Sequence, residues 1–220
     1  MNKPNYNNEM KNIIKELNAS PEGVKAKLLL HACCAPCSST CMERVRDGFE
    51  TTVYFYNPNI TNEEEYGKRA RELERLIDIY NEDTDHGQIG YLEGNYDPRE
   101  FTDIARGYED CPERGDRCVR CFTLRLKNAA KMAKNKGYDY FTTTLTLSPL
   151  KDVDLLNRIG EEAAAEVGGI RWLPSDFKKD DGYRRSIELS REYDLYRQDY
   201  CGCIYSKLER ERVKREGLQA

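Results

Sequence analysis

Helical and extended spacing of apolar residues alternate along most of the chain. The apolar run Lys27–Ala32 and the β-branched and aromatic run Thr51–Tyr56 predict two buried strands. Between them, Ser38 or Ser39 is a suitable N-cap for a helix that ends near Asp47. Further strands are predicted at 88–92, 140–146 and 170–173, and further helices at 8–18, 63–80, 98–106, 118–136, 153–167, 182–193 and 205–215.

This regular alternation of strand and helix predicts an α/β fold. The economical arrangement is a single domain, a three-layer sandwich in which helices cover both faces of a parallel sheet. Such sheets bind ligands beyond the carboxyl ends of their strands, where the strand order reverses. The loop Cys33–Cys37 follows the first strand. We therefore expect this loop at the ligand site.

Composition narrows the class of protein. The chain has 220 residues, of which 39% are hydrophobic, with 35 basic and 39 acidic side chains and a net charge of −4. These values exclude a disordered chain and a protein that is basic all over its surface. The first 20 residues do not resemble a signal peptide, and the apolar runs are too short to cross a membrane. We expect a cytoplasmic protein with reduced thiols and no membrane partner.

The nine cysteines fall into three groups, each after a predicted strand or at the start of a helix. The groups are Cys33, Cys34, Cys37 and Cys41; Cys111, Cys118 and Cys121; and Cys201 and Cys203. In a reducing compartment such thiols are more often metal ligands or redox groups than disulfides. Adjacent thiols and a C-x₂-C pair suit an iron–sulfur cluster or structural zinc, and packing cysteines without a ligand are the third interpretation.

The pair Cys201-Gly202-Cys203 carries more information. A disulfide across C-x-C is strained and easily reduced, which is typical of a redox switch. The alternatives are two further metal ligands or two buried thiols. Cys37 completes a second C-x₂-C with Cys34 and is either a metal ligand or a reactive free thiol that binds no metal. Cys41 lies one helical turn further and is interpreted as a packing residue, and Cys111 is left unassigned.

Charge and the remaining polar residues add secondary hypotheses. Residues 111–136 hold eight basic and two acidic side chains, a local net charge of 8 − 2 = +6, and a second basic set near 178–197 is accompanied by tyrosines. Both sets suit a polynucleotide or, alternatively, a solvated helix face. No glycine-rich phosphate loop indicates a nucleotide or flavin. His31 is a candidate proton donor, or else a satisfied core histidine, and Tyr200 is another donor candidate.

Several short motifs occur in a fixed order. They are Leu30–Ser38, Gly115–Phe122, Phe141–Leu145, Ser148–Lys151, Asp176–Lys179 and Tyr196–Cys203. Together they resemble the epoxyqueuosine reductase family of the QueH type, from about residue 28 to residue 206. The resemblance implies a fold of the adenine-nucleotide-hydrolase-like (HUP) kind. It also implies reduction of the epoxide of epoxyqueuosine, at the wobble position of tRNA, to the alkene of queuosine.

The resemblance assigns roles to the cysteines. Cys33, Cys34, Cys118 and Cys121 correspond to the ligands of a [4Fe-4S] cluster. Cys201 and Cys203 correspond to a redox-active pair or to ligands of an additional iron. Cys37 is a further candidate ligand of that iron, although some members have a carboxylate at its position. The implied partners are tRNA carrying epoxyqueuosine and an unidentified electron donor.

The same resemblance sets the domain boundaries. We expect an N-terminal helical extension over residues 1–25, the catalytic domain over 26–206, and a C-terminal helical tail over 207–220. Two other function classes remain open on the residues alone. One is a zinc-stabilised RNA-binding module without catalysis, and the other is a protein thiol–disulfide oxidoreductase that uses only Cys201 and Cys203.

Overall fold

The computed structural model describes residues 4–19 and 25–217, and it contains one five-stranded sheet in which all strands are parallel. The strands are β1 (Lys27–Ala32), β2 (Glu50–Phe55), β3 (Ile89–Glu93), β4 (Tyr140–Thr143) and β5 (Arg171–Trp172). The helices are α1 (Tyr6–Asn18), α2 (Ala35–Val45), α3 (Glu63–Glu82), α4 (Pro98–Ala105), α5 (Asp116–Asn135), α6 (Val153–Val167), α7 (Gly182–Glu192) and α8 (Ile204–Arg215). The predicted α/β class is confirmed.

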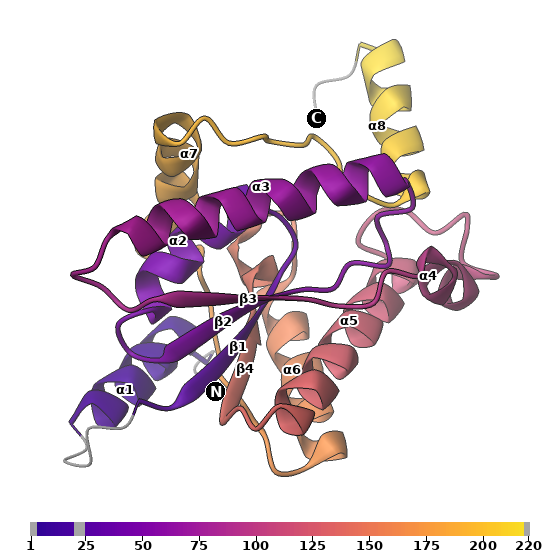
Figure 1. Ribbon diagram of the computed structural model, residues 1–220. Coiled ribbons are helices and arrows are strands. Elements are labelled where there is room, and N and C mark those ends of the chain that lie inside the picture. The colour runs from indigo at the N-terminus through magenta and orange to yellow at the C-terminus, as the bar shows by residue number, and fades with distance from the viewer. Residues whose placement is uncertain (1–3, 20–24, 218–220) are drawn as a thin grey trace.

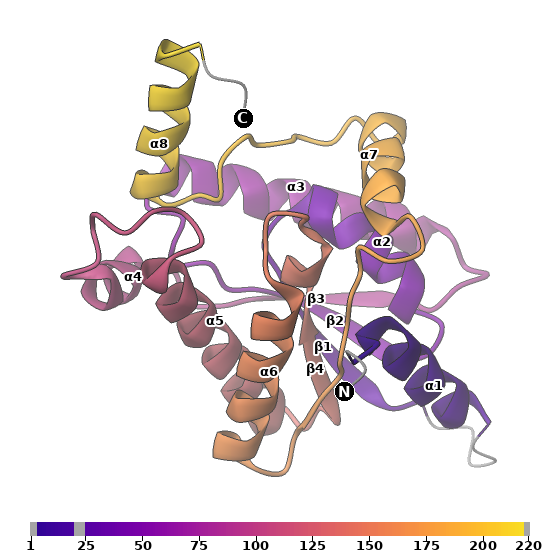
Figure 2. The same ribbon diagram turned by 180° about the vertical axis from the view of Figure 1, so that it is seen from behind.

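Two apolar layers bury the sheet from both sides. Leu28 and Leu30 of β1 pack into the core under α1, α2 and α3, whereas Leu29 packs into the core under α5 and α6. Successive side chains of a strand point to opposite faces, so a strand that is buried on both faces is apolar throughout. Figure 1 and Figure 2 show these helix layers on opposite sides of the sheet. The structure therefore confirms the predicted three-layer sandwich.

The strand order places the first loop at the centre of the molecule. The order is β3-β2-β1-β4-β5, so the chain builds outward from β1 to β3 and then crosses back to the other side of β1. The strand order reverses between β1 and β4. Beyond their carboxyl ends, the Cys33 N–H donates a hydrogen bond to the Thr144 hydroxyl at 3.4 Å. The predicted location of the Cys33–Cys37 loop is confirmed.

Three local predictions were wrong. Helix α2 begins at Ala35, with Cys34 rather than Ser38 or Ser39 as N-cap, because Pro36 sets a helical φ in the first turn. The predicted strand 140–146 ends at Thr143, whose hydroxyl accepts from the Leu145 N–H and starts a 3₁₀ turn over 144–147. Helix α5 begins at Asp116 instead of Cys118. The C-x₂-C pair therefore lies on the first turns of a helix.

The two terminal helices differ in how they contact the body. Met10 of α1 is buried in the core, whereas Leu208 of α8 is exposed and α8 projects from the molecule in Figure 1. The predicted boundaries at 25/26 and 206/207 stay predictions, and residues 20–24 next to the first of them lie outside the described residues. The HUP-like relationship also stays a prediction. Within residues 4–19 and 25–217, no helix is both long enough and apolar enough to cross a bilayer.

Candidate metal and thiol site

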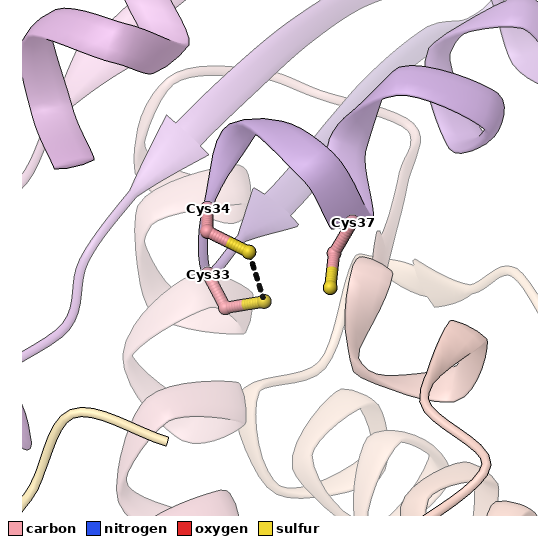
Figure 3. Close-up of side chains that lie close together, drawn as sticks. All are labelled: Cys33, Cys34 and Cys37. Atoms are coloured by element: carbon pink, nitrogen blue, oxygen red, sulfur yellow. Dashed lines mark hydrogen bonds between the residues drawn. The ribbon is translucent and has the colours of Figure 1, made fainter. Parts of the chain in front are cut away.

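Three thiols of the first cysteine group converge beyond β1. The sulfurs of Cys33, Cys34 and Cys37 lie within 4.8 Å of one another, and the Cys33 and Cys34 sulfurs are 3.7 Å apart (Figure 3). The local fold explains this convergence. Cys33 ends the extended segment, Cys34 is the N-cap of α2, and Cys37 lies in the first turn. A helix N-terminus favours negative charge and therefore thiolates.

Hydrogen bonds among these three thiols make them differ in pKa. Hydrogen bonds from Cys34 and then from Cys37 hold the pKa of Cys33 well below its usual range. The same bond from Cys34 to Cys33 raises the pKa of Cys34 to about 12, and Cys33 and Cys34 together raise the pKa of Cys37. Of the three thiols, Cys33 is therefore the one that ionises most readily, with its two neighbours as the hydrogen-bond donors that stabilise its thiolate form. A thiolate is the form that binds metal.

Four thiols from the other two groups line one small cavity. Cys118 and Cys121 come from the first turns of α5, and Cys201 and Cys203 come from the segment before α8. The cavity has a volume of about 20 Å³, and Arg117 also lines it. Burial raises the pKa of Cys121 to about 12 and also raises the pKa of Cys118 and of Cys203. The second and third groups, 80 residues apart in sequence, therefore meet in the fold.

The remaining two cysteines lie outside both gatherings of thiols. Cys41 is fully buried in the core under α2, where burial raises the pKa of its thiol, so its interpretation as a packing residue is confirmed. Cys111 is half-buried, and its carbonyl accepts a hydrogen bond from Arg117. All nine cysteines are free thiols.

Lys151 links the two gatherings of thiols electrostatically. Burial lowers the pKa of Lys151, but the nearby sulfurs of Cys201, Cys33 and Cys37 outweigh burial, and the net pKa is raised. The ammonium group is therefore charged at neutral pH. The same charge therefore acts on sulfurs of both gatherings. Sequence analysis quoted Lys151 only as part of a motif and assigned it no role.

Arg69 of α3 holds the segment that carries the C-x-C pair. Its side chain is 2% exposed, and it donates to the carbonyls of Cys201 at 3.2 Å and Tyr200 at 3.4 Å. Its Nε forms an ion pair with Glu65 at 2.7 Å. Sequence analysis missed Arg69. The available signal was an arginine next to the apolar face of a helix, three residues after Tyr66.

Comparison with known proteins decides the family. The family model described as epoxyqueuosine reductase QueH matches residues 28–209, which include both gatherings of thiols. The chain belongs to the QueH family. This result confirms the resemblance that the ordered motifs indicated.

Curated relatives in this family are similar over most of their length. The epoxyqueuosine reductase QueH of Streptococcus pyogenes is 42% identical over 204 residues, 93% of this chain and 78% of the relative. That of Staphylococcus epidermidis is 39% identical over 209 residues, 94% and 86% of the two chains. The epoxyqueuosine reductase QueH of Thermotoga maritima is 34% identical over 183 residues, which cover 83% of this chain and 91% of the relative. The family similarity therefore covers the whole sheet.

His31 is a core residue of this QueH-family fold. It is fully buried, its Nε2 lies 3.1 Å from the Tyr56 carbonyl, and its Nδ1 lies 2.8 Å from the Thr143 hydroxyl. Burial, followed by the charge of Arg125, lowers the pKa of His31 to about 3. The ring is therefore neutral near pH 7, and the structure favours the satisfied core histidine. Tyr200 is half-buried, with the Arg69 guanidinium 5.2 Å from its ring.

The basic sets are smaller on the surface than their sequence indicates. Arg117 and Arg125 are buried, and Lys127 forms an ion pair with Glu166. In the second set, Arg185 forms an ion pair with Glu43 at 2.7 Å, and Arg184 forms one with Asp181 at 3.1 Å. The two hypotheses for residues 111–136, a polynucleotide contact or a solvated helix face, therefore rest on fewer exposed charges than the sequence shows. The exposed charge of that set is less than its local net charge of +6.

Proposed function

We propose that this chain reduces epoxyqueuosine in tRNA to queuosine. The observation that carries the proposal is the QueH family membership of a chain in which seven cysteines gather in two clusters, three beyond β1 and four around one cavity. In the reaction both C–O bonds of the epoxide break, a C=C bond forms and the oxygen leaves as water. This change consumes two electrons and two protons. We place it in the cytoplasm, where thiols stay reduced.

The donor set fits a metal centre made of iron and sulfur. Thiolates are the ligands that iron–sulfur clusters require, and the pKa of Cys33 is held well below its usual range by its hydrogen bonds. We assign four cysteines as ligands of a [4Fe-4S] cluster, namely Cys33, Cys34, Cys118 and Cys121. The sulfur of Cys37 also lies within 4.8 Å of the Cys33 and Cys34 sulfurs. When bound, such a cluster supplies electrons one at a time.

Cys201 and Cys203 are assigned as the redox pair. Two thiols that form one disulfide release two electrons and two protons, which equals what the epoxide consumes. Both thiols line the cavity that also holds Cys118 and Cys121. An electron donor must then reduce the disulfide again. The alternative assignment within the same proposal makes Cys37, Cys201 and Cys203 ligands of an additional iron.

Metal analysis of protein purified without oxygen tests the cofactor. We expect about four irons and four acid-labile sulfides per chain. A fifth iron would favour the additional-iron assignment. Zinc without sulfide would overturn the cluster and favour a zinc-stabilised RNA-binding module. Activity toward protein disulfides without any metal would instead favour a thiol–disulfide oxidoreductase.

Substitution of the C-x-C pair tests the reaction. Cys201→Ser and Cys203→Ser are each expected to lower turnover of epoxyqueuosine in tRNA by at least about 100-fold, the scale of losing an essential catalytic group. Iron and sulfide content should not change. Cys111→Ser is the matched control, because Cys111, like Cys201, is half-buried and is not among the residues that line the cavity. Full activity of either C-x-C variant would remove the redox pair from the mechanism.

A further inference from the structure

Arg125 of α5 is a buried cation without a carboxylate partner. Its side chain is 1% exposed, and no ion pair among the described residues includes it. One nitrogen, Nη2, donates to the Asn57 side-chain oxygen at 2.5 Å. The Nε and Nη1 groups have no hydrogen-bond acceptor within the described part of the chain. A guanidinium stays charged in proteins, so leaving these donors unpaired is costly.

The position of Arg125 shows what balances its charge. It follows Cys118 by seven residues and Cys121 by four, so all three side chains lie on one face of α5. Asn57, its hydrogen-bond partner, donates in turn to the carbonyl of Ala32, the residue before Cys33. This chain of bonds joins the helix of Cys121 to the strand end of Cys33. Arg125 therefore lies between the two gatherings of thiols.

The electrostatics agree with this placement. After the hydrogen bonds from Cys34 and Cys37, the charges of Lys151 and Arg125 add to the lowering of the pKa of Cys33. At Cys121 the charge of Arg125 opposes the burial that raises the pKa of that thiol. Arg125 therefore acts electrostatically on one thiol of each gathering.

We propose that Arg125 is a positioning residue for the metal centre, donating from its two unpaired nitrogens, Nε and Nη1, to the anionic sulfur of the bound centre and raising the reduction potential of that centre. The inference rests on the proposed function only in requiring a metal centre between these cysteines. A buried positive charge stabilises the reduced form, which carries one more negative charge, and hydrogen bonds to sulfur act in the same direction.

Three variants test this role. Arg125→Met removes the charge at similar length, and Arg125→Lys keeps the charge but loses the fork of donors. Arg46→Met is the matched control, because Arg46 is also buried, at 8% exposed, but pairs with Asp83 at 2.9 Å and is not among the residues of the thiol site. The first readout is the midpoint potential of the anaerobically loaded protein, from a redox titration followed by absorbance.

We expect Arg125→Met to shift the equilibrium toward the oxidised form about tenfold, which is about 59 mV for a one-electron couple. Arg125→Lys should shift it less, and Arg46→Met should leave it unchanged. The second readout is the melting temperature with the centre bound and after its removal. Arg125→Met should lose more stability in the loaded protein than in the stripped protein, because the unpaired charge is itself a cost when nothing anionic is bound.

The outcomes separate this inference from the proposed function. An unchanged potential in Arg125→Met, or an equal loss of stability with and without the centre, overturns the role of Arg125 and leaves the reductase assignment in place. Failure of Arg125→Met to retain the centre, while Arg125→Lys and Arg46→Met retain it, supports the role. Equal failure of all three variants overturns it. Absence of iron and sulfide from the wild-type protein overturns the cofactor assignment and this inference together.

Discussion

Adding one methyl group at Gly202 should release the C-x-C segment from the body of the protein. Gly202 has φ +123°, a backbone conformation that L side chains rarely adopt. A Cβ there would lie 2.8 Å from Cγ1 of the buried Ile60 and 3.3 Å from Nη1 of Arg69. The Gly202 carbonyl also accepts from the Thr61 N–H at 3.3 Å. Gly202→Ala therefore disturbs the surface on which the segment rests.

The size of the effect follows from two costs. The backbone strain is about 1–3 kcal/mol, and displacing a buried side chain costs about 1–3 kcal/mol more. Gly137→Ala is the matched control, because Gly137 has φ +74° with no atom within 4 Å of the added Cβ. That control carries strain of about 1–2 kcal/mol alone. The additional free-energy cost of Gly202→Ala over Gly137→Ala should raise the population in which the segment is exposed, by about tenfold for each 1.4 kcal/mol.

Thiol labelling measures this exposure. In reduced, metal-stripped protein, the rate of alkylation of Cys203 by iodoacetamide is followed by peptide mass spectrometry, with the buried Cys41 as internal reference. We expect Cys203 to react at least about tenfold faster in Gly202→Ala than in Gly137→Ala, while Cys41 stays protected in both. Equal rates for Cys203 in the two variants would refute the reasoning, because they would show that contact with Ile60 and Arg69 does not hold the segment.

Two further predictions concern stability. The pKa of His31 is about 3 in the folded chain against an ordinary value of 6.5, so between these two pH values His31 takes up a proton when the chain unfolds. The free energy of unfolding therefore keeps the whole contribution of His31 above pH 6.5 and falls by about 1.4 kcal/mol per pH unit toward pH 3. Urea unfolding of stripped His31→Gln should show a shallower decline over this range, and an unchanged slope would contradict a neutral buried ring. In α6, Gly160→Ala would place a Cβ 2.3 Å from the Trp172 ring and should cost about 1–3 kcal/mol in chemical denaturation. Gly67→Ala in α3 is the control, because only the end of the Arg71 side chain must move; it should cost nothing or stabilise the protein by up to about 1 kcal/mol. Equal losses of stability in the two variants would contradict close packing of the Trp172 ring against Gly160.

Local errors in the sequence analysis have local physical causes. The serines at 38 and 39 are good N-cap residues, yet their hydroxyls bond to the carbonyls of Cys34 and Pro36 inside the helix. Pro36 fixes the start of α2 earlier, because its φ is already helical. In β4 the run of threonines has strand propensity, but the Thr143 hydroxyl caps a turn instead. The start of α2 therefore depends on the φ of one proline, and the end of β4 depends on one side-chain hydrogen bond.

The sequence alone determined the fold class, the strand at 27–32, the helix at 153–167 and the three groups of cysteines. These features follow from periodicity and spacing, which are properties of neighbouring residues. Its ordered motifs also indicated the family. Sequence periodicity shows that a side chain is buried, but it does not show what that side chain meets.

Only the tertiary structure decided which thiols meet and which cations accompany them. Arg69 contacts the carbonyl of Cys201, 132 residues later, because α3 packs beside the segment before α8. Arg125 belongs to the basic set of residues 111–136, yet α5 turns it into the core beside Cys121. The physical reason is that burial of a charge depends on the opposite charges brought to it by distant parts of the chain. Arg69 has the carboxylate of Glu65 as its partner, whereas Arg125 has only the side-chain oxygen of Asn57 among the described residues.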